Sequence, residues 1–283
     1  MKLASSVCRV AGATTVLVVG ASAHAQSPAS NESSLRDTVV VTATRVEQSS
    51  FDLPVSIEAF DSATIQEGQQ QVNLSETVGR APGVVANTRQ NYAQDLQISI
   101  RGFGARSTFG IRGVRLYTDG VPLTMPDGSG QAANVDLSSA QRIEVMRGPF
   151  SALYGNSSGG VISVFTEDGP KDFGVSTSLW TGSNGTNRLG VQAGGEAGKV
   201  NYVFHVARFD TDGFREHSAT TRDTFNGKIR FDVGDRSHLT FTTNYLTQPD
   251  TQDPLGLTLA QLNANREQAG NAAIAQNTRK DIR

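Results

Sequence analysis

The chain has 283 residues, and its 25 basic side chains nearly balance 27 acidic ones to give a net charge of −2. This balance, with no polybasic tail, argues against a nucleic-acid partner. A single cysteine excludes an internal disulfide, and the four histidines lack the spacing of metal ligands, so we predict no metal site and no cofactor.

The first 25 residues are predicted to be a secretory signal peptide. Lys2 and Arg9 give a positive start, an apolar run covers Val10 to Gly20, and Ala23-His24-Ala25 forms a small-x-small cleavage signal. The apolar run is about half the ~20 residues that a membrane-spanning helix needs, which disfavours an N-terminal anchor. No later apolar stretch is long enough for such a helix. If the mature protein sits in a membrane, it therefore does so as β-structure.

Residues 26–50 are predicted to form a flexible leader. Its first part is polar and lacks aromatic side chains, which is typical of disorder. The run DTVVVTATR at 37–45 is instead rich in β-branched residues, so it favours an extended backbone. It could add as a strand to the sheet of a partner protein, or it could be an ordinary first strand of the next domain.

Residues 51–168 are predicted to form an α+β domain. Asp61 is expected to cap a helix beginning at Ser62, and Asn73 a second helix that carries Leu74 and Val78 and ends at Ala81-Pro82-Gly83. The expected strands are Val55–Phe60, Leu96–Arg101, Val114–Asp119, Arg142–Met146 and Val161–Thr166, with a helical turn at Ser151–Tyr154.

The motifs of enzymes are missing from this domain. The glycine-rich turn Arg101–Gly104 has neither GxGxxG nor GxxxxGK[ST] spacing, so we interpret it as a plain loop. Gly128-Ser129-Gly130 lacks the GxSxG frame, and no HExxH occurs. We therefore expect no catalytic residues and no enzyme activity.

After Gly169-Pro170 the hydrophobic period changes to two. Leu189, Val191 and Ala193 alternate with polar or small residues, and the same pattern continues through 202–207 and 225–233. With Phe173–Trp180 and His238–Leu246, this predicts five strands in residues 169–247. An apolar face opposite a charged one fits a strand between lipid and a wet lumen, although a soluble sandwich gives the same alternation. Short turns near 196–199 and 234–237, with longer loops at 210–222 and after 247, favour an outer-membrane barrel.

The motifs of the α+β domain occur in a diagnostic order. IRGF, YTDGVP, IEVMRGP and LYGNSSGGVISV follow one another over residues 100–164, after LSETVGRAPGVV and the 37–45 run. This series resembles the plug domain of TonB-dependent outer-membrane receptors. The resemblance implies a plug domain followed by the first strands of an antiparallel transmembrane β-barrel, in the outer membrane of a Gram-negative bacterium. It also implies that outer-membrane lipid surrounds the strands.

The resemblance assigns roles to particular residues. The TonB box, which would bind the energising protein TonB, is expected at Asp37, Thr38, Val39, Val40, Val41, Thr42 and Ala43. Ligand-facing loops are expected to present Arg89, Tyr92, Arg106, Met125, Asp127 and Gln131. Arg101, Glu144 and Arg147 are expected to form a charge network that holds the plug in the barrel.

The ligand is expected to be a scarce nutrient, most simply an anionic chelate such as a ferric siderophore, which arginines would attract. TMPDGSGQ at 124–131, with STFGIRGVRLYTDG before it, looks closest to an iron-transporter subgroup to which a pyrroloquinoline quinone receptor belongs. Pyrroloquinoline quinone and cobalamin stay open as alternatives.

The length departs from the family. Large plugged barrels have ~22 strands, whereas residues 169–247 provide five, followed by an expected extracellular loop at 248–283. The simplest expectation is the N-terminal part of a longer receptor that ends before barrel closure. The alternatives are a nonfunctional truncated remnant and an exported β-rich interaction protein.

Overall fold

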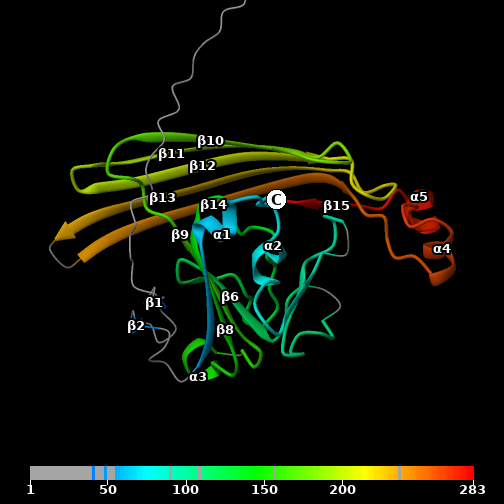
Figure 1. The fold of residues 1–283 in the computed structure, drawn as a ribbon, viewed down its shortest axis with the longest axis horizontal. Coiled ribbons are helices and arrows are strands. Elements are labelled where there is room, and N and C mark those ends of the chain that lie inside the picture. The colour runs from blue at the N-terminus through cyan, green and yellow to red at the C-terminus, as the bar shows by residue number, and fades with distance from the viewer. Residues whose placement is uncertain are drawn as a thin grey trace, which may run out of the picture. The chain divides into compact units, whose positions relative to one another are not determined.

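The computed structural model describes residues 40–41, 48–49, 55–88, 91–107, 110–155, 157–234 and 237–283 (Figure 1). The predicted signal peptide lies outside this range, as does most of the predicted TonB box. Within that box, β1 (Val40–Val41) pairs antiparallel with β2 (Gln48–Ser49).

An α+β domain follows, built on a five-stranded sheet with the order β3-β8-β9-β6-β7. Its strands are β3 (Ser56–Asp61), β6 (Val114–Thr118), β7 (Val121–Pro122), β8 (Ala140–Arg147) and β9 (Gly160–Thr166). Only β6 and β9 run parallel to each other among these pairs. The remaining elements are the hairpin of β4 (Val84–Asn87) and β5 (Gln97–Ile100), and the short helices α1 (Ser62–Gln66), α2 (Ser75–Val78) and α3 (Ser151–Tyr154). The predicted strands and helical turn are thus found, with β4 and β7 in addition.

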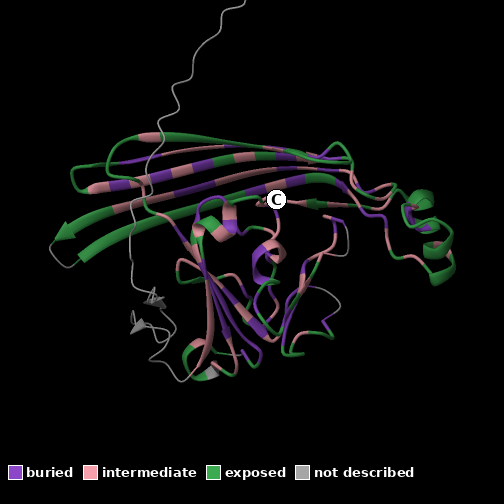
Figure 2. Cartoon of the chain, in the orientation of Figure 1, coloured by how far each residue is buried: buried purple, intermediate pink, exposed green. Residues whose placement is uncertain are grey.

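The core of this domain gathers apolar side chains from all of its layers. Ile65 of α1, Ile98 of β5 and Ile143 of β8 belong to one buried cluster with less than 1% of their surface exposed. Burying each such side chain contributes about 1.5–3 kcal/mol. Figure 2 shows the resulting concentration of buried positions in the strands beneath α1 and α2.

The two helix starts differ in how well the sequence predicted them. Asp61 caps α1 as expected, because its Oδ1 accepts the amide of Thr64 at 2.8 Å. The Asn73 cap was wrong: α2 has no side-chain cap of this kind. The Glu76 carboxylate instead accepts the amides of Gln71, Val72 and Asn73 at 2.7–2.9 Å. A side chain in the first turn thus reaches back to the amides of the segment that leads into α2.

A six-stranded antiparallel sheet occupies the rest of the chain, with its strands in sequence order from β10 to β15. The strands are β10 (Gly174–Thr181), β11 (Asn187–Ala197), β12 (Val200–Thr211), β13 (Thr220–Gly234), β14 (Ser237–Gln252) and β15 (Arg279–Ile282). No helix among the described residues is long and apolar enough to cross a membrane.

The two faces of this sheet follow the predicted alternation. Val191, Val206, Phe225 and Tyr245 are cross-strand neighbours in one row of the register, and Gln192, His205, Asn226 and Asn244 form the next row. The first row belongs to an exposed apolar face that also includes Leu179, Leu189 and Phe241. The second row belongs to the face that contacts the α+β domain. Figure 2 shows the change between buried and exposed positions along these strands.

The strands are longer than predicted, since β12 and β13 extend into the expected loop at 210–222 and β14 continues past Thr247. Backbone pairing carries these polar segments, so side-chain hydrophobicity does not mark their ends. The segment after β14 also holds α4 (Leu259–Ala264) and α5 (Asn271–Gln276), where only a loop was expected.

Candidate functional site

A cavity of about 700 Å³ lies where loops of the α+β domain meet β14. Such a volume suits a small-molecule ligand, because ligand pockets typically measure ~300–1,000 Å³. Its lining residues are Asp95, Gly110, Arg112, Leu123, Met125, Ser129, Gly130, Gln131, Ala133, Asn134, Asn244, Tyr245, Leu246, Ile282 and Arg283.

The charges on the domain side of the cavity are partly compensated. Lys280 Nζ lies 2.8 Å from Asp95 Oδ1, so that carboxylate already has a cation. Arg112 lies 3.9 Å from Asp127, and both side chains are more than 60% exposed. Exposed pairs of this kind are weak. Arg112 is therefore free to turn toward an anion in the cavity.

Asp127 is held mainly by its own loop. The hydroxyl of Ser129 donates to Asp127 Oδ1 at 2.7 Å and the Ser129 amide at 3.0 Å. These hydrogen bonds keep the pKa of Asp127 below its ordinary value. The carboxylate stays ionised at neutral pH and fixes the turn that carries Met125 to the cavity.

The structure divides the predicted ligand residues. Met125 and Gln131 line the cavity, and Asp127 lies beside Arg112, which also lines it. Arg106 is exposed and lines neither this cavity nor a second one of about 340 Å³. Arg89 lies outside the described residues. Arg112 and Asn134 line the cavity but were not among the predicted ligand residues. Tyr245 was missed because sequence spacing does not show that β14 faces these loops.

Tyr92 lies at a second, smaller cavity of about 340 Å³, which Trp180 and Phe214 also line. Its ring centroid is 5.1 Å from that of Phe209, and its carbonyl accepts from Gln248 Nε2 at 2.9 Å. Burial, with a smaller effect of Glu76, raises the pKa of Tyr92 to about 12. Its phenol therefore stays protonated at neutral pH.

The residues of the predicted charge network have described partners inside the α+β domain. Fully buried Glu144 lies 2.9 Å from Arg142 Nε. Arg147 lies 3.4 Å from Glu58 and donates to the Pro82 carbonyl at 2.8 Å. Arg101 is exposed, and its amide donates to the carbonyl of Gly83 at 2.8 Å. That these residues hold the domain in a barrel stays a prediction.

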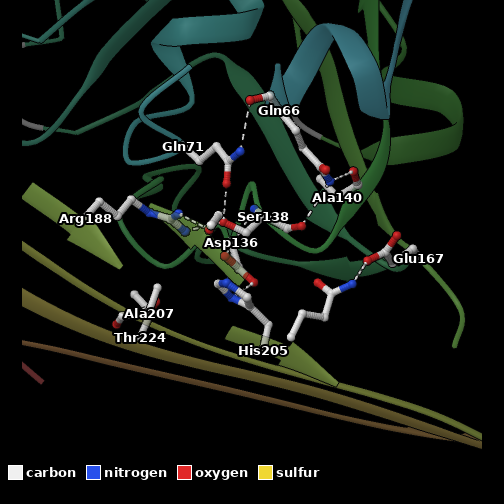
Figure 3. A network of polar contacts seen from close by, with 12 residues as sticks. Gln66, Gln71, Asp136, Ser138, Ala140, Glu167, Arg188, His205, Ala207 and Thr224 are labelled. Atoms are coloured by element: carbon white, nitrogen blue, oxygen red, sulfur yellow. Dashed lines mark hydrogen bonds and ion pairs between the residues drawn. The ribbon is translucent and has the colours of Figure 1, made fainter. Parts of the chain in front are cut away.

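Another set of side chains joins the domain to the sheet (Figure 3). Arg188 donates to the Ser138 hydroxyl, and Nδ1 of His205 lies 2.9 Å from Asp136 Oδ2. The remaining contacts are Arg222 to the carbonyls of Val72 and Ala133, Gln192 to Glu167, Lys228 to Asp168 and the Thr166 carbonyl, and Arg230 to Asp168. Cations thus lie on the sheet and carboxylates on the domain.

No group of three or more His, Cys, Asp or Glu residues within the described ranges is placed to hold a metal ion.

Comparison with known proteins identifies the α+β domain. Residues 49–161 match the family model described as TonB-dependent Receptor Plug Domain. The chain is 31% identical over 162 residues to the vitamin B12 transporter BtuB of Vibrio vulnificus (strain CMCP6), covering 57% of this chain and 25% of the relative. It is 29% identical over 244 residues to the iron-regulated outer membrane virulence protein of Vibrio cholerae, covering 84% and 35%.

A solved structure extends the likeness beyond that domain. The pyoverdine outer membrane receptor FpvA from Pseudomonas aeruginosa PAO1 matches with a TM-score of 0.62 at 21% identity, over 74% of this chain and 30% of that one. At this identity the match shows the fold alone, and that fold includes strands beyond the matched domain. The chain spans a quarter to about a third of the length of these relatives.

Proposed function

Because residues 49–161 belong to the plug domain family of TonB-dependent receptors, we propose that the chain is the plug-bearing part of an outer-membrane receptor, and not an enzyme. The receptor takes up a scarce nutrient from outside a Gram-negative cell, using energy delivered by TonB. The observation that carries this proposal is the cavity of about 700 Å³ between the plug loops and β14.

The chemistry of the cavity favours an anionic ligand, such as a ferric siderophore or another iron chelate. Arg112 offers a guanidinium whose exposed partner, Asp127, holds it weakly. Met125 and Tyr245 add polarisable and aromatic surface that can cover the apolar part of a chelate. Asp95, the carboxylate that would repel an anion, is paired with Lys280.

The exposed face of the sheet suits contact with outer-membrane lipid. Leu179 is 74% exposed, Phe241 56% and Leu189 54%. A contiguous apolar face of this kind is costly in water and favourable in hydrocarbon. The opposite face carries the charged side chains that contact the plug, which fits a barrel wall with the plug on its inside.

Energy coupling is assigned to residues 37–43. An extended, β-branched segment can pair with the sheet edge of TonB through main-chain hydrogen bonds. Val40–Val41 already pairs with Gln48–Ser49. TonB must therefore use the other edge of β1 or displace β2.

The proposal predicts that Arg112→Gln weakens ligand binding, whereas Arg106→Gln does not. Both arginines are exposed plug-loop residues, but only Arg112 lines the cavity. Loss of a charge-assisted contact costs about 1.5–3 kcal/mol, or roughly a tenfold to hundredfold rise in Kd. The measurement is binding of a panel of ferric siderophores, cyanocobalamin and pyrroloquinoline quinone to cells that produce the receptor.

Binding of one iron chelate that is weakened only by Arg112→Gln supports the proposal. Binding of cyanocobalamin or pyrroloquinoline quinone instead would support the receptor function but contradict the choice of an iron chelate as its ligand. Equal affinities in the two variants would contradict the assignment of the cavity as the ligand site.

A further inference from the structure

The inner face of the sheet presents cations to one short segment of the plug, residues 132–140. Arg188 and Arg222 lie in one cross-strand row, on either side of Phe209. His205 lies on the same face, separated from that row by the row of Gly190, Ala207 and Thr224. Arg188 and Arg222 are each 5% exposed, and His205 is 2% exposed. Buried guanidinium groups on one surface repel each other, and they would also repel a protonated imidazole, unless a negative charge lies among them.

Asp136 supplies that charge. Its Oδ2 lies 2.9 Å from Nδ1 of His205, and both side chains are 5% exposed or less. It also attracts Arg188 and Arg222 electrostatically. Burial alone would raise the pKa of Asp136, but the contact with His205 and the hydrogen bond from the Ser138 amide outweigh it, so the pKa is lowered. The carboxylate is therefore ionised at neutral pH.

Other charged groups act on the same interface. From the plug, Glu167 interacts with His205, Asp136 and Lys228, and Glu76 interacts with Arg188 and Arg222. The Glu76 carboxylate is held by three backbone amides, and Glu167 is bonded to Gln192. These two acids have their own partners, so they cannot replace Asp136 beside His205.

Neutral hydrogen bonds continue the contact into the plug (Figure 3). Ser138 accepts from Arg188 and donates to Gln71 Oε1 at 2.7 Å. Gln71 Nε2 donates to the Gln66 carbonyl at 3.0 Å, and Gln66 Nε2 donates to the carbonyls of Ser138 and Ala140. The charged contacts therefore act on a segment that is already tied to α1.

The glycine at position 190 leaves room for this arrangement. A Cβ there would lie 2.6 Å from the Ser178 hydroxyl, 3.2 Å from His205 Nε2 and 3.3 Å from an Arg188 nitrogen. His205 Nε2 is buried and has no hydrogen-bond partner among the described residues. Within the part of the chain that the structure describes, Asp136 is the carboxylate that contacts the imidazole.

We propose that Asp136 is an electrostatic latch, which holds plug residues 132–140 against the inner face of the sheet, where it contacts His205 and attracts the guanidinium groups of Arg188 and Arg222. Neutralising the carboxylate releases the segment. The same segment joins the cavity residues Ala133 and Asn134 to β8. The latch therefore lies between the candidate ligand site and the sheet of the plug, and any movement of the plug away from the wall must break it.

The test is hydrogen exchange of backbone amides in the purified protein in detergent, without ligand. Asp136→Asn is expected to raise exchange in 132–140 about tenfold or more, because it leaves buried cations unpaired. Asp127→Asn is the matched control: it removes the same charge from an exposed plug carboxylate bonded to its own loop, and leaves 132–140 unchanged. Amides of β9 report whether the plug core stays folded.

Asp136→Glu separates charge from shape. It keeps the negative charge in a larger side chain, and a smaller increase in exchange than in the Asn variant supports the latch. The proposal is overturned if Asp136→Asn exchanges like the unaltered protein, or if the Glu variant is as fast as the Asn variant. Loss of protection in β9 of the Asn variant would mean that the plug core has also opened. In that case the Glu variant decides: restored protection supports the latch, and protection that is not restored overturns it. Because no ligand is used, this result is independent of the proposed uptake function.

Discussion

At the scale of single residues, Gly159 and Gly160 explain one of the motifs that marked the domain. Gly160 starts β9 with φ +148°, between Arg147 of β8 and Val114 of β6. A Cβ at Gly160 would lie 2.1 Å from the Met146 carbonyl oxygen, and one at Gly159 would lie 2.7 Å from Phe103 Cβ. The SGGVISVF sequence thus needs glycine because the backbone enters the centre of the sheet there.

We expect Gly160→Ala to destabilise the protein by roughly 2–5 kcal/mol, from steric overlap added to backbone strain. Gly120→Ala is the control: it also has a positive φ, +80°, but its Cβ would meet no atom within 4 Å. It should cost roughly 1–2 kcal/mol. Thermal unfolding in detergent measures both, and equal shifts in Tm would show that the close approach to Met146 is unimportant.

Residue-level contacts were predictable only where they are local. The Asp61 cap depends on a residue three positions away, and it was predicted correctly. The Asn73 cap was wrong: α2 begins after Leu74 without a side-chain cap, and Asn73 contributes its own amide to the Glu76 carboxylate instead. The pair of Asp136 and His205 was not predictable, since it joins two domains through the register of β12.

At the scale of elements, Arg215 joins two loops that follow different strands. Its guanidinium donates to the carbonyls of Leu255 at 2.7 Å, Gln268 at 3.0 Å and Pro254 at 3.2 Å. One side chain from the loop between β12 and β13 thereby fixes both ends of the segment that contains α4. Only the planar, multiply donating guanidinium can satisfy these acceptors together.

Arg215→Lys is expected to weaken the contacts that hold residues 253–270, because lysine keeps the positive charge but lacks the planar guanidinium that donates to several carbonyls. A loss of about 1–2 kcal/mol would raise the rate of cleavage by proteinase K there about tenfold. Arg266→Lys is the control, since Arg266 is exposed in the same segment. Unchanged cleavage in Arg215→Lys would mean that other contacts hold the loops together.

The elements were predictable where the sequence has a clear hydrophobic period. The period-two alternation in 187–246 predicted the long strands and their apolar face, because a pleated strand sends successive side chains to opposite faces. The segment 253–283 is polar and without a clear period, so α5 and β15 could not be predicted. The start of α4 does have a local sequence signal, because Thr258 and Gln261 form a capping box.

At the scale of the whole molecule, the long sheet has two chemically different faces. Its exposed face is apolar, and its inner face bears cations that meet carboxylates and carbonyls of the plug. The candidate ligand cavity lies at the same plug–sheet boundary as the latch. In the proposed receptor, the apolar face would contact lipid, charge pairs would seat the plug, and a movement of the plug would change the ligand site.

The most direct test of energised uptake is accumulation of the bound ligand in cells that produce the receptor with Val41→Pro. Proline removes an amide donor from the predicted TonB-binding strand. We predict normal surface binding, but accumulation reduced to that of cells treated with a proton uncoupler. Ser33→Pro, in the polar leader, should accumulate ligand normally. Uptake in the Val41→Pro variant that equals uptake in the control, and still depends on the proton gradient, would contradict the assignment of residues 37–43 as the coupling segment.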